Sequence, residues 1–212
     1  GIVTREQRQW IQLTAALTML IDHIGVVFFP TVLGFRAIGR LSFPLFAFGI
    51  AQGVLYTHDF WRYLGRILLT AMLSQPIYML LFGIAEGNPL FMLAWGAAAL
   101  YAWRQGKRAV AAVLLIGAGF ADMSYGWYGV WTIFFFDRYE RRRSFCFYGQ
   151  LVLNLLYGWQ TKAWIQVLSL FSFGFLEGNW RIAALSKRLP RYFFYVFYPL
   201  HLLVLWGIRA AG

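Results

Sequence analysis

An aspartate and a histidine stand side by side, as Asp22-His23, inside a run that otherwise lacks acidic and basic side chains. The run lies between Arg8 and Arg36 and reads QWIQLTAALTMLIDHIGVVFFPTVLGF. It is long enough to cross a bilayer. Because ionisable groups are costly in hydrocarbon, such pairs usually face a protein interior and carry out chemistry or conduct an ion or solute.

His23 is the first candidate for a general base, because a neutral imidazole can take a proton from a nucleophile and later return it. At helical rise it lies about 20 Å from the start of this span, in the half of the membrane farther from that end. The Asp22 side chain points about 100° away around the helix. We therefore expect Asp22 to pair with a cation from another helix rather than to orient the His23 ring.

Arg40 is the candidate partner of Asp22. It lies in the run GRLSFPLFAFG, where Pro44 can kink the helix and free a carbonyl group. Arg40 could instead bind an anionic group of a substrate or anchor the helix end at the membrane interface.

A second histidine, His201, lies near the middle of the last apolar run, YFFYVFYPLHLLVLWG. Pro199 should disturb the helix beside it, and Tyr198 is a neighbouring polar group. If His201 faces the interior, it could orient a substrate or stabilise a developing oxyanion. As an isolated residue it could equally be a packed, hydrogen-bonded histidine.

Three further polar residues, Asn88, Ser124 and Tyr125, occur in the short stretches GNPLF and SYG. Such residues are ordinary in turns. The topology derived below nevertheless places them in the same outer half as Asp22, His23 and Arg40, so we regard them as candidates for substrate binding, together with Tyr198.

The composition predicts a membrane protein with little mass outside the bilayer. The 212 residues are 60% apolar and only 13% charged, whereas a soluble domain carries about 25% charged residues. Charges divide the chain into about nine apolar segments. We place them near residues 10–30, 41–57, 67–85, 88–103, 109–121, 124–136, 145–161, 163–176 and 191–208.

Loop charges orient these segments. With the N-terminus in the cytoplasm, all but four of the 19 basic residues fall on the cytoplasmic side, as the positive-inside rule expects. The exceptions are Arg36, Arg40, Lys162 and Arg209. The chain is therefore predicted to be all-α, a polytopic helical bundle of about nine short transmembrane helices. The segments around Asp122 could be two short spans or a re-entrant hairpin, and the charge asymmetry favours two spans.

Several classes of protein are excluded or disfavoured. The net charge of +11 comes from short clusters between apolar runs, so we do not expect nucleic-acid binding. A single cysteine, Cys146, excludes an internal disulfide, and the spacing of the three histidines does not suggest a metal site. No cleavable signal peptide is evident. Missing internal repeats weaken a transporter interpretation, and we expect one integral membrane domain over residues 1–212.

The basic clusters on the cytoplasmic side mainly set the orientation of the chain in the membrane. A polyanionic cofactor such as coenzyme A would nevertheless need positive charge of this kind to bind. The candidates for coenzyme A binding are Arg62, Arg66, Arg104 and Arg142.

Together these stretches resemble the TraX family of conjugative-plasmid membrane proteins, which acetylate the N-terminus of pilin. The resemblance rests on LTMLIDHIG, GRLSFPLFAF, GNPLF, SYG and LPRYFFYVFYPLHLLVL, in the family's order over nearly the whole chain. It implies an acetyl-CoA-dependent acyltransferase without a metal, a multi-pass protein of the bacterial cytoplasmic (inner) membrane. It also implies His23 as the base, supported by Asp22, Arg40 and His201.

Three functions remain open at this stage. N-acetylation of a pilin or other peptide leads, with acetyl-CoA reaching His23 from the cytoplasm and the acceptor from outside. O-acetylation of an envelope glycan or lipid would use the same donor. A proton-coupled small-solute transporter would also explain an aspartate and a histidine inside the membrane. Both direct transfer and a covalent acetyl-histidine intermediate are compatible with the sequence.

Overall fold

The computed structural model describes residues 3–177, 189–190 and 192–212, and these form helices and connecting turns. In chain order the helices are α1 (Arg5–Phe28), α2 (Leu33–Gly39), α3 (Ser42–Tyr56), α4 (Phe60–Phe82), α5 (Pro89–Arg104), α6 (Arg108–Gly117), α7 (Gly126–Phe136), α8 (Arg143–Thr161), the 3₁₀ helix η1 (Trp164–Phe171), α9 (Ser172–Glu177) and α10 (Phe193–Ala211). Each predicted apolar segment corresponds to a helix, with η1 and α9 sharing 163–176. The predicted basic cluster Arg181, Lys187, Arg188 and Arg191 lies outside the described residues.

Within the described residues, four helical segments are long and apolar enough to cross a membrane. They are Glu6–Phe28, Leu33–Tyr56, Phe60–Phe82 and Phe193–Ala211. The described part of the chain is thus all-helical, and these apolar segments indicate a membrane protein. The remaining helices are shorter or less apolar, so the full count of nine spans stays a prediction.

The ends of the long helices follow from local capping chemistry. Thr4 begins α1 with a capping box, in which its hydroxyl accepts from the Gln7 backbone and the Gln7 side chain accepts from the Thr4 backbone. Asp59 caps α4 by accepting from the Arg62 backbone amide. Because of this cap, α4 begins seven residues before the predicted start at residue 67. Arg62 and Arg66 therefore belong to the helix and not to a loop.

The second membrane segment is broken, and the sequence prediction missed its first part, α2. Pro44 lies in the first turn of α3 and has no backbone N–H to donate to the carbonyl group of Arg40, four residues earlier. The helix is interrupted between Gly39 and Ser42. At this break, Gly39 and Arg40 lie against Asp22 of α1.

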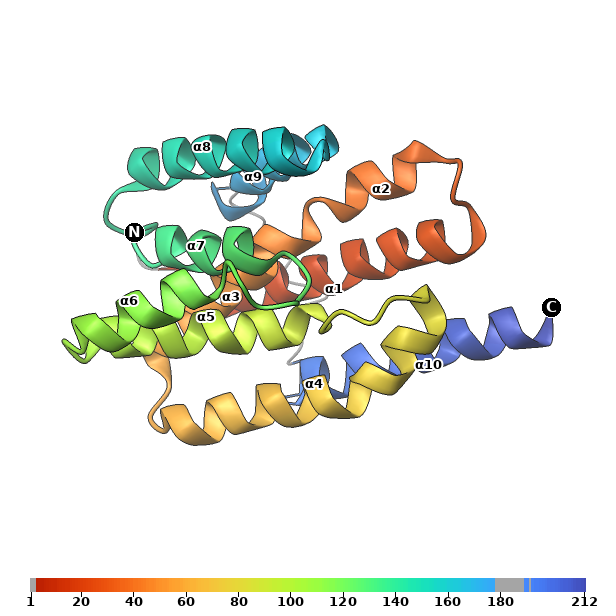
Figure 1. The fold of residues 1–212 in the computed structure, drawn as a ribbon, viewed down its shortest axis with the longest axis horizontal. Helices are drawn as coiled ribbons and strands as arrows, with labels where there is room; N and C mark the ends of the chain where they lie inside the picture. The colour runs from red at the N-terminus through yellow and green to blue at the C-terminus, as the bar shows by residue number, and fades with distance from the viewer. Residues whose placement is uncertain (1–2, 178–188, 191) are drawn as a thin grey trace.

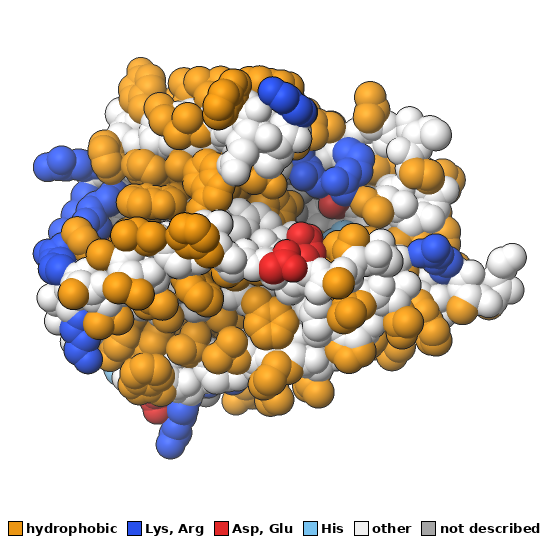
Figure 2. Space-filling view, in the orientation of Figure 1, with side chains coloured by type: hydrophobic (Ala, Val, Ile, Leu, Met, Phe, Trp, Pro, Cys, Tyr) orange, Lys and Arg blue, Asp and Glu red, His pale blue; other side chains and the backbone are white. Residues whose placement is uncertain are grey.

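The helices alternate in direction, so the loops gather at two ends of the molecule (Figure 1). We call one the site end, formed by residues 29–32, 83–88, 118–125 and the C-terminus. The other is the basic end, formed by residues 3–4, 57–59, 105–107 and 137–142. Figure 2 shows many of the visible Lys and Arg side chains at the basic end, on the left. At the site end, Gly87 exchanges backbone hydrogen bonds with Asp122 and Ser124, which ties two loops together.

The core lies where α3, α5 and α7 meet, and its largest fully buried side chains include Phe48, Tyr128 and Phe136. A second cluster joins α1, α4 and α10 through residues that include Met19, Leu81 and Leu202. Large apolar side chains cover much of the outer surface (Figure 2). An apolar exterior of this extent fits a surface that is solvated by lipid.

Close packing of α1 on α2 depends on Gly25. A Cβ atom at this position would lie 2.2 Å from Cβ of Phe35, an atom too near its own backbone to move aside. We expect Gly25→Ala to lower the free energy of unfolding by about 1–3 kcal/mol through overpacking. Gly34→Ala is the matched control, because a Cβ atom there meets nothing within 4 Å. Thermal unfolding in detergent tests this, and equal stability of the two variants would contradict it.

Candidate functional site

Asp22 is held between two arginines at the site end. Arg40 Nη2 lies 3.2 Å and Arg36 Nη1 lies 3.0 Å from the Asp22 carboxylate. The side chains of Arg40 and Asp22 are only 9% and 12% exposed, whereas that of Arg36 is 35% exposed. The predicted pairing of Asp22 with Arg40 is therefore confirmed, and Arg36, which the sequence analysis treated only as a loop charge, is a second partner.

The approach of the two chains is possible because residue 39 is glycine. A Cβ atom on Gly39 would lie 2.2 Å from Oδ1 of Asp22. Any larger residue would thus displace the carboxylate from its partners.

A buried polar network fixes the other side of Arg40. Its Nη1 donates to the amide oxygen of Gln166 at 3.1 Å, and the Gln166 amide nitrogen donates to the Tyr128 hydroxyl at 3.3 Å. Tyr128 in turn donates to Asn154 at 3.2 Å. The network connects the end of α2 with α7, α8 and η1 through buried side chains. It leaves Arg40 with little freedom to move.

The two intramembrane histidines form a hydrogen-bonded pair. Nδ1 of His23 and Nε2 of His201 are 2.8 Å apart, and Nδ1 of His201 lies 2.9 Å from the carbonyl oxygen of Phe197. A carbonyl oxygen only accepts, so the neutral His201 ring carries its proton on Nδ1 and its Nε2 accepts. His23 must then donate from Nδ1. Its Nε2 is left with an unshared electron pair, which is the form that a general base requires.

His23 lines a cavity of about 660 Å³ at the site end. Arg36, Arg40 and Glu86 also line it. Figure 2 shows a hollow right of centre, with basic and acidic side chains on its rim. Oppositely charged groups and an imidazole therefore face one space.

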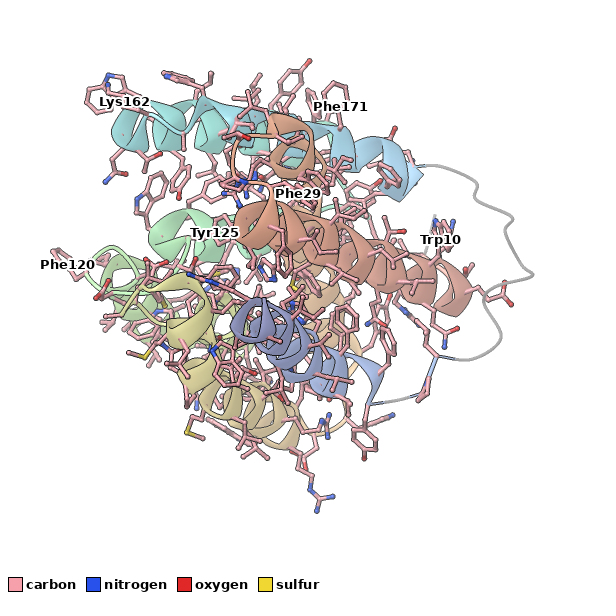
Figure 3. All side chains as sticks on the ribbon, turned by 90° about the vertical axis from the view of Figure 1, so that its right-hand side faces the viewer. Trp10, Phe29, Phe120, Tyr125, Lys162 and Phe171 are labelled. Atoms are coloured by element: carbon pink, nitrogen blue, oxygen red, sulfur yellow. The ribbon has the colours of Figure 1, made fainter. Side chains whose placement is uncertain are left out.

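Ser124 and Tyr125 line the same cavity, as the sequence analysis expected from their topology. Tyr125 has a φ angle of +64°, a left-handed conformation that is uncommon for a residue other than glycine and that occurs often at functional sites. Its ring stacks on Phe43 at 4.2 Å. In Figure 3, which looks onto the site end, Tyr125 lies toward the centre, whereas Phe120 and Lys162 project outward.

A smaller pocket of about 50 Å³ adjoins the cavity beside His23. Its wall is mainly apolar and includes Phe43, Phe46 and Leu93. Tyr198 also lines it and packs edge-on against the His201 ring at 5.5 Å. The Tyr198 hydroxyl is buried and has no hydrogen-bond partner within the described part of the chain. A small apolar group next to the imidazole would fit this pocket.

Asn88 is placed differently from the other candidates. Its side chain is fully buried, donates to the Ala71 carbonyl oxygen at 2.8 Å and accepts from the Leu90 amide at 3.0 Å. It thereby caps α5 and joins that helix to α4. A substrate-binding role for Asn88 stays a prediction.

The four arginines predicted to bind coenzyme A lie at or near the basic end, but they do not converge. Arg62 pairs with Asp59, Arg66 lies over the Tyr195 ring, and Arg104 pairs with Asp137. Arg142 precedes α8 and is exposed. Arg104 lines a hollow at this end together with three other arginines.

The sequence analysis did not single out Glu86 or Gln166 as members of the site. Each carried a signal, since Glu86 directly precedes the GNPLF stretch and Gln166 interrupts an apolar run. A buried amide in a membrane helix is itself unusual enough to mark a polar contact.

Comparisons with known proteins found a family and a relative. A family described as TraX protein matches residues 7–209. A relative described as a probable fimbrial assembly protein, FimC of serogroup H1 from Dichelobacter nodosus, is 29% identical over 106 residues. The match covers 42% of this chain and 43% of that relative, so less than half of its length is spanned. No solved structure matches the chain significantly.

Removing the Asp22 charge should destabilise the protein strongly. We expect Asp22→Asn to lower the free energy of unfolding by about 3–5 kcal/mol, because it leaves the buried Arg40 guanidinium uncompensated. Asp59→Asn is the control. Loss of its exposed ion pair with Arg62 should lower the free energy of unfolding by less than about 1 kcal/mol. The asparagine side chain introduced there can still cap α4. Thermal unfolding in detergent compares the two variants. If both variants lost similar free energy of unfolding, burial of the Asp22 cluster would not determine its contribution to stability.

Proposed function

This chain belongs to the TraX family, and we propose that it is an acetyltransferase of the bacterial cytoplasmic membrane. It would transfer an acetyl group from acetyl-coenzyme A to an amine. The observation that supports this proposal best is the His23–His201 pair, which leaves one ring nitrogen of His23 unprotonated in a side chain that lines a cavity.

We place the N-terminus and the basic end in the cytoplasm. The support is the concentration of basic residues at that end, which is typical of cytoplasmic loops. The cavity then opens toward the outer side. Donor and acceptor would approach His23 from opposite compartments.

His23 would act as the general base. Its Nε2 takes a proton from the attacking amine while the amine nitrogen forms a bond to the thioester carbonyl carbon. The tetrahedral intermediate then breaks its carbon–sulfur bond. The His23 imidazolium returns the proton to the departing sulfur, which leaves as the thiol of coenzyme A. The small pocket lined by Phe43 and Phe46 would hold the acetyl methyl group during these steps.

His201 would position the base rather than touch the substrate. Both of its ring nitrogens are engaged, one by His23 and one by the Phe197 carbonyl oxygen. It accepts from Nδ1 of His23 and so keeps the free electron pair on Nε2. The oxyanion of the intermediate would be stabilised by cavity groups, with Tyr125 and Arg36 the best placed because both line the cavity.

We further propose that the acceptor is a peptide amine, such as the N-terminus of a pilin. The relative from Dichelobacter nodosus is described as a probable fimbrial assembly protein, which supports a pilus-related acceptor. Glu86 offers a second argument, because its carboxylate lies on the cavity wall and can attract an ammonium group. An α-amino group has a pKa of about 8, so its neutral, reactive form is accessible at neutral pH.

Replacing His23 with Gln should abolish acetyl transfer, since no base remains at the cavity. We expect His201→Leu to lower kcat about 10²–10⁴-fold and His201→Gln to retain more activity, because its amide oxygen can still accept from His23. His58→Ala, an exposed histidine at the basic end, is the control and should behave as the wild type. Transfer of radiolabelled acetyl groups to a peptide, measured across pH, tests all four variants. Wild-type turnover by His23→Gln would refute the proposal.

Charge at the cavity mouth should distinguish an amine acceptor from a hydroxyl acceptor. We expect Glu86→Gln to raise KM for a peptide amine about tenfold, the effect of losing one charge-assisted contact, and to leave KM for acetyl-coenzyme A unchanged. Glu6→Gln removes an exposed carboxylate at the basic end and serves as the control. Mass spectrometry identifies the modified atom. If the acetyl group were found on a glycan hydroxyl, and the Glu86→Gln substitution did not change that reaction, the acceptor would be an envelope glycan and the proposed peptide acceptor would be wrong.

A further inference from the structure

A hollow of about 720 Å³ opens at the basic end, at the opposite pole of the molecule from the histidine cavity. Its wall comes from the end of α3, the α5–α6 turn and the α7–α8 turn (Figure 1). Four arginines line it: Arg104, Arg108, Arg138 and Arg141.

Two of these arginines share one carboxylate within the protein. The Asp137 carboxylate, whose side chain is 2% exposed, accepts from both Arg104 and Arg138. These contacts fix the two guanidinium groups and join the α5–α6 turn to the α7–α8 turn. The rim of the hollow is thereby held rigid before any ligand binds.

The other two arginines, Arg108 and Arg141, make no ion pair with a carboxylate in the described part of the chain. The Arg108 guanidinium lies over the Trp103 ring, with its Cζ atom 3.7 Å from the ring centre. This stacking orders the group while its N–H donors at the edge stay available. One carboxylate in the hollow, that of Glu140, already accepts from Gln52. The hollow therefore holds ordered positive charge in excess of its own acids, which suits a ligand with several phosphate groups.

Three hollows lie along α3 between this end and His23. The basic hollow shares Gln52 and Tyr56 with a second hollow of about 370 Å³ between α1 and α3. The small pocket beside His23 lies farther along the same two helices. From Tyr56 to Phe46 the helical rise amounts to about 15 Å, a length that an extended pantetheine chain can span. Phe46, which lines the small pocket, contacts Phe194 of α10 edge-on at 4.8 Å.

We propose that the hollow lined by Arg104, Arg108, Arg138 and Arg141 binds the phosphate groups of the donor nucleotide. The pantetheine chain then extends along α3 toward His23. This inference rests on the proposed acetyl transfer for the identity of the ligand. Of the arginines that the sequence analysis suggested for the cofactor, it retains Arg104 and replaces the other three.

Binding of desulfo-coenzyme A to the purified protein in nanodiscs tests the proposal without any transfer step. We expect the double variant Arg108→Ala/Arg141→Ala to weaken binding at least tenfold. Lys107→Ala removes one exposed positive charge next to Arg108 but does not line the hollow. This control should bind as the wild type does. Equal affinity of the double variant and the wild type would overturn the proposal.

An anionic lipid headgroup carries the same phosphate chemistry, so short-chain phosphatidylglycerol is titrated in parallel. If 3′,5′-adenosine bisphosphate displaces desulfo-coenzyme A and the lipid does not, the result supports a nucleotide site. Binding of the lipid with no binding of either nucleotide probe overturns it.

The outcomes separate this inference from the proposed function. A double variant that transfers acetyl groups with unchanged KM for acetyl-coenzyme A refutes the site and leaves the function intact. A wild-type protein that binds desulfo-coenzyme A through Arg108 and Arg141, yet transfers no acetyl group, supports the site and refutes the function.

Discussion

The Asp22 carboxylate between Arg36 and Arg40 is the interaction on which the site depends. Three charges in or near the bilayer are costly unless they satisfy one another. Their mutual contacts fix α1 against α2 at the level of His23. The helix break before Pro44, the glycine at position 39 and the polar network from Gln166 to Asn154 all make that contact possible. The fold around the histidines is arranged to hold this cluster.

The pair of histidines shows how a membrane interior can orient an imidazole without a carboxylate. In a Ser-His-Asp triad an aspartate orients the imidazole and stabilises its charged form. Here a second imidazole takes the orienting role, and a backbone carbonyl group fixes that second ring. In this arrangement His23 contacts a neutral partner, His201, whereas the negative charge of Asp22 is balanced by Arg36 and Arg40. Orientation and charge balance are thus separated between two sets of residues.

Much of the fold was predictable because hydrophobicity and charge determine where membrane helices lie. The apolar segments all correspond to helices, and the pairing of Asp22 with Arg40 followed from the cost of an unpaired charge. The contact between His23 and His201 could not be predicted, since the two residues are 178 positions apart and a helix face cannot be assigned from one sequence. Arg36 and the α2 helix were missed because Pro30 and Gly34 resemble loop residues. The convergence of the α5–α6 and α7–α8 turns through Asp137 likewise depends on tertiary packing.

The edge-on contact between Phe46 and Phe194 has a consequence for the membrane itself. Polar spaces that approach each other from two compartments would form a leak for protons if nothing apolar stood between them. Phe46 lines the small pocket beside His23, so under the proposed function its contact with Phe194 is placed to act as that seal. If the chain transfers acetyl groups as we propose, the donor chain would displace a ring and fill the gap with its own atoms, so the barrier to ions would persist through each turnover and the energy stored across the bilayer would be preserved.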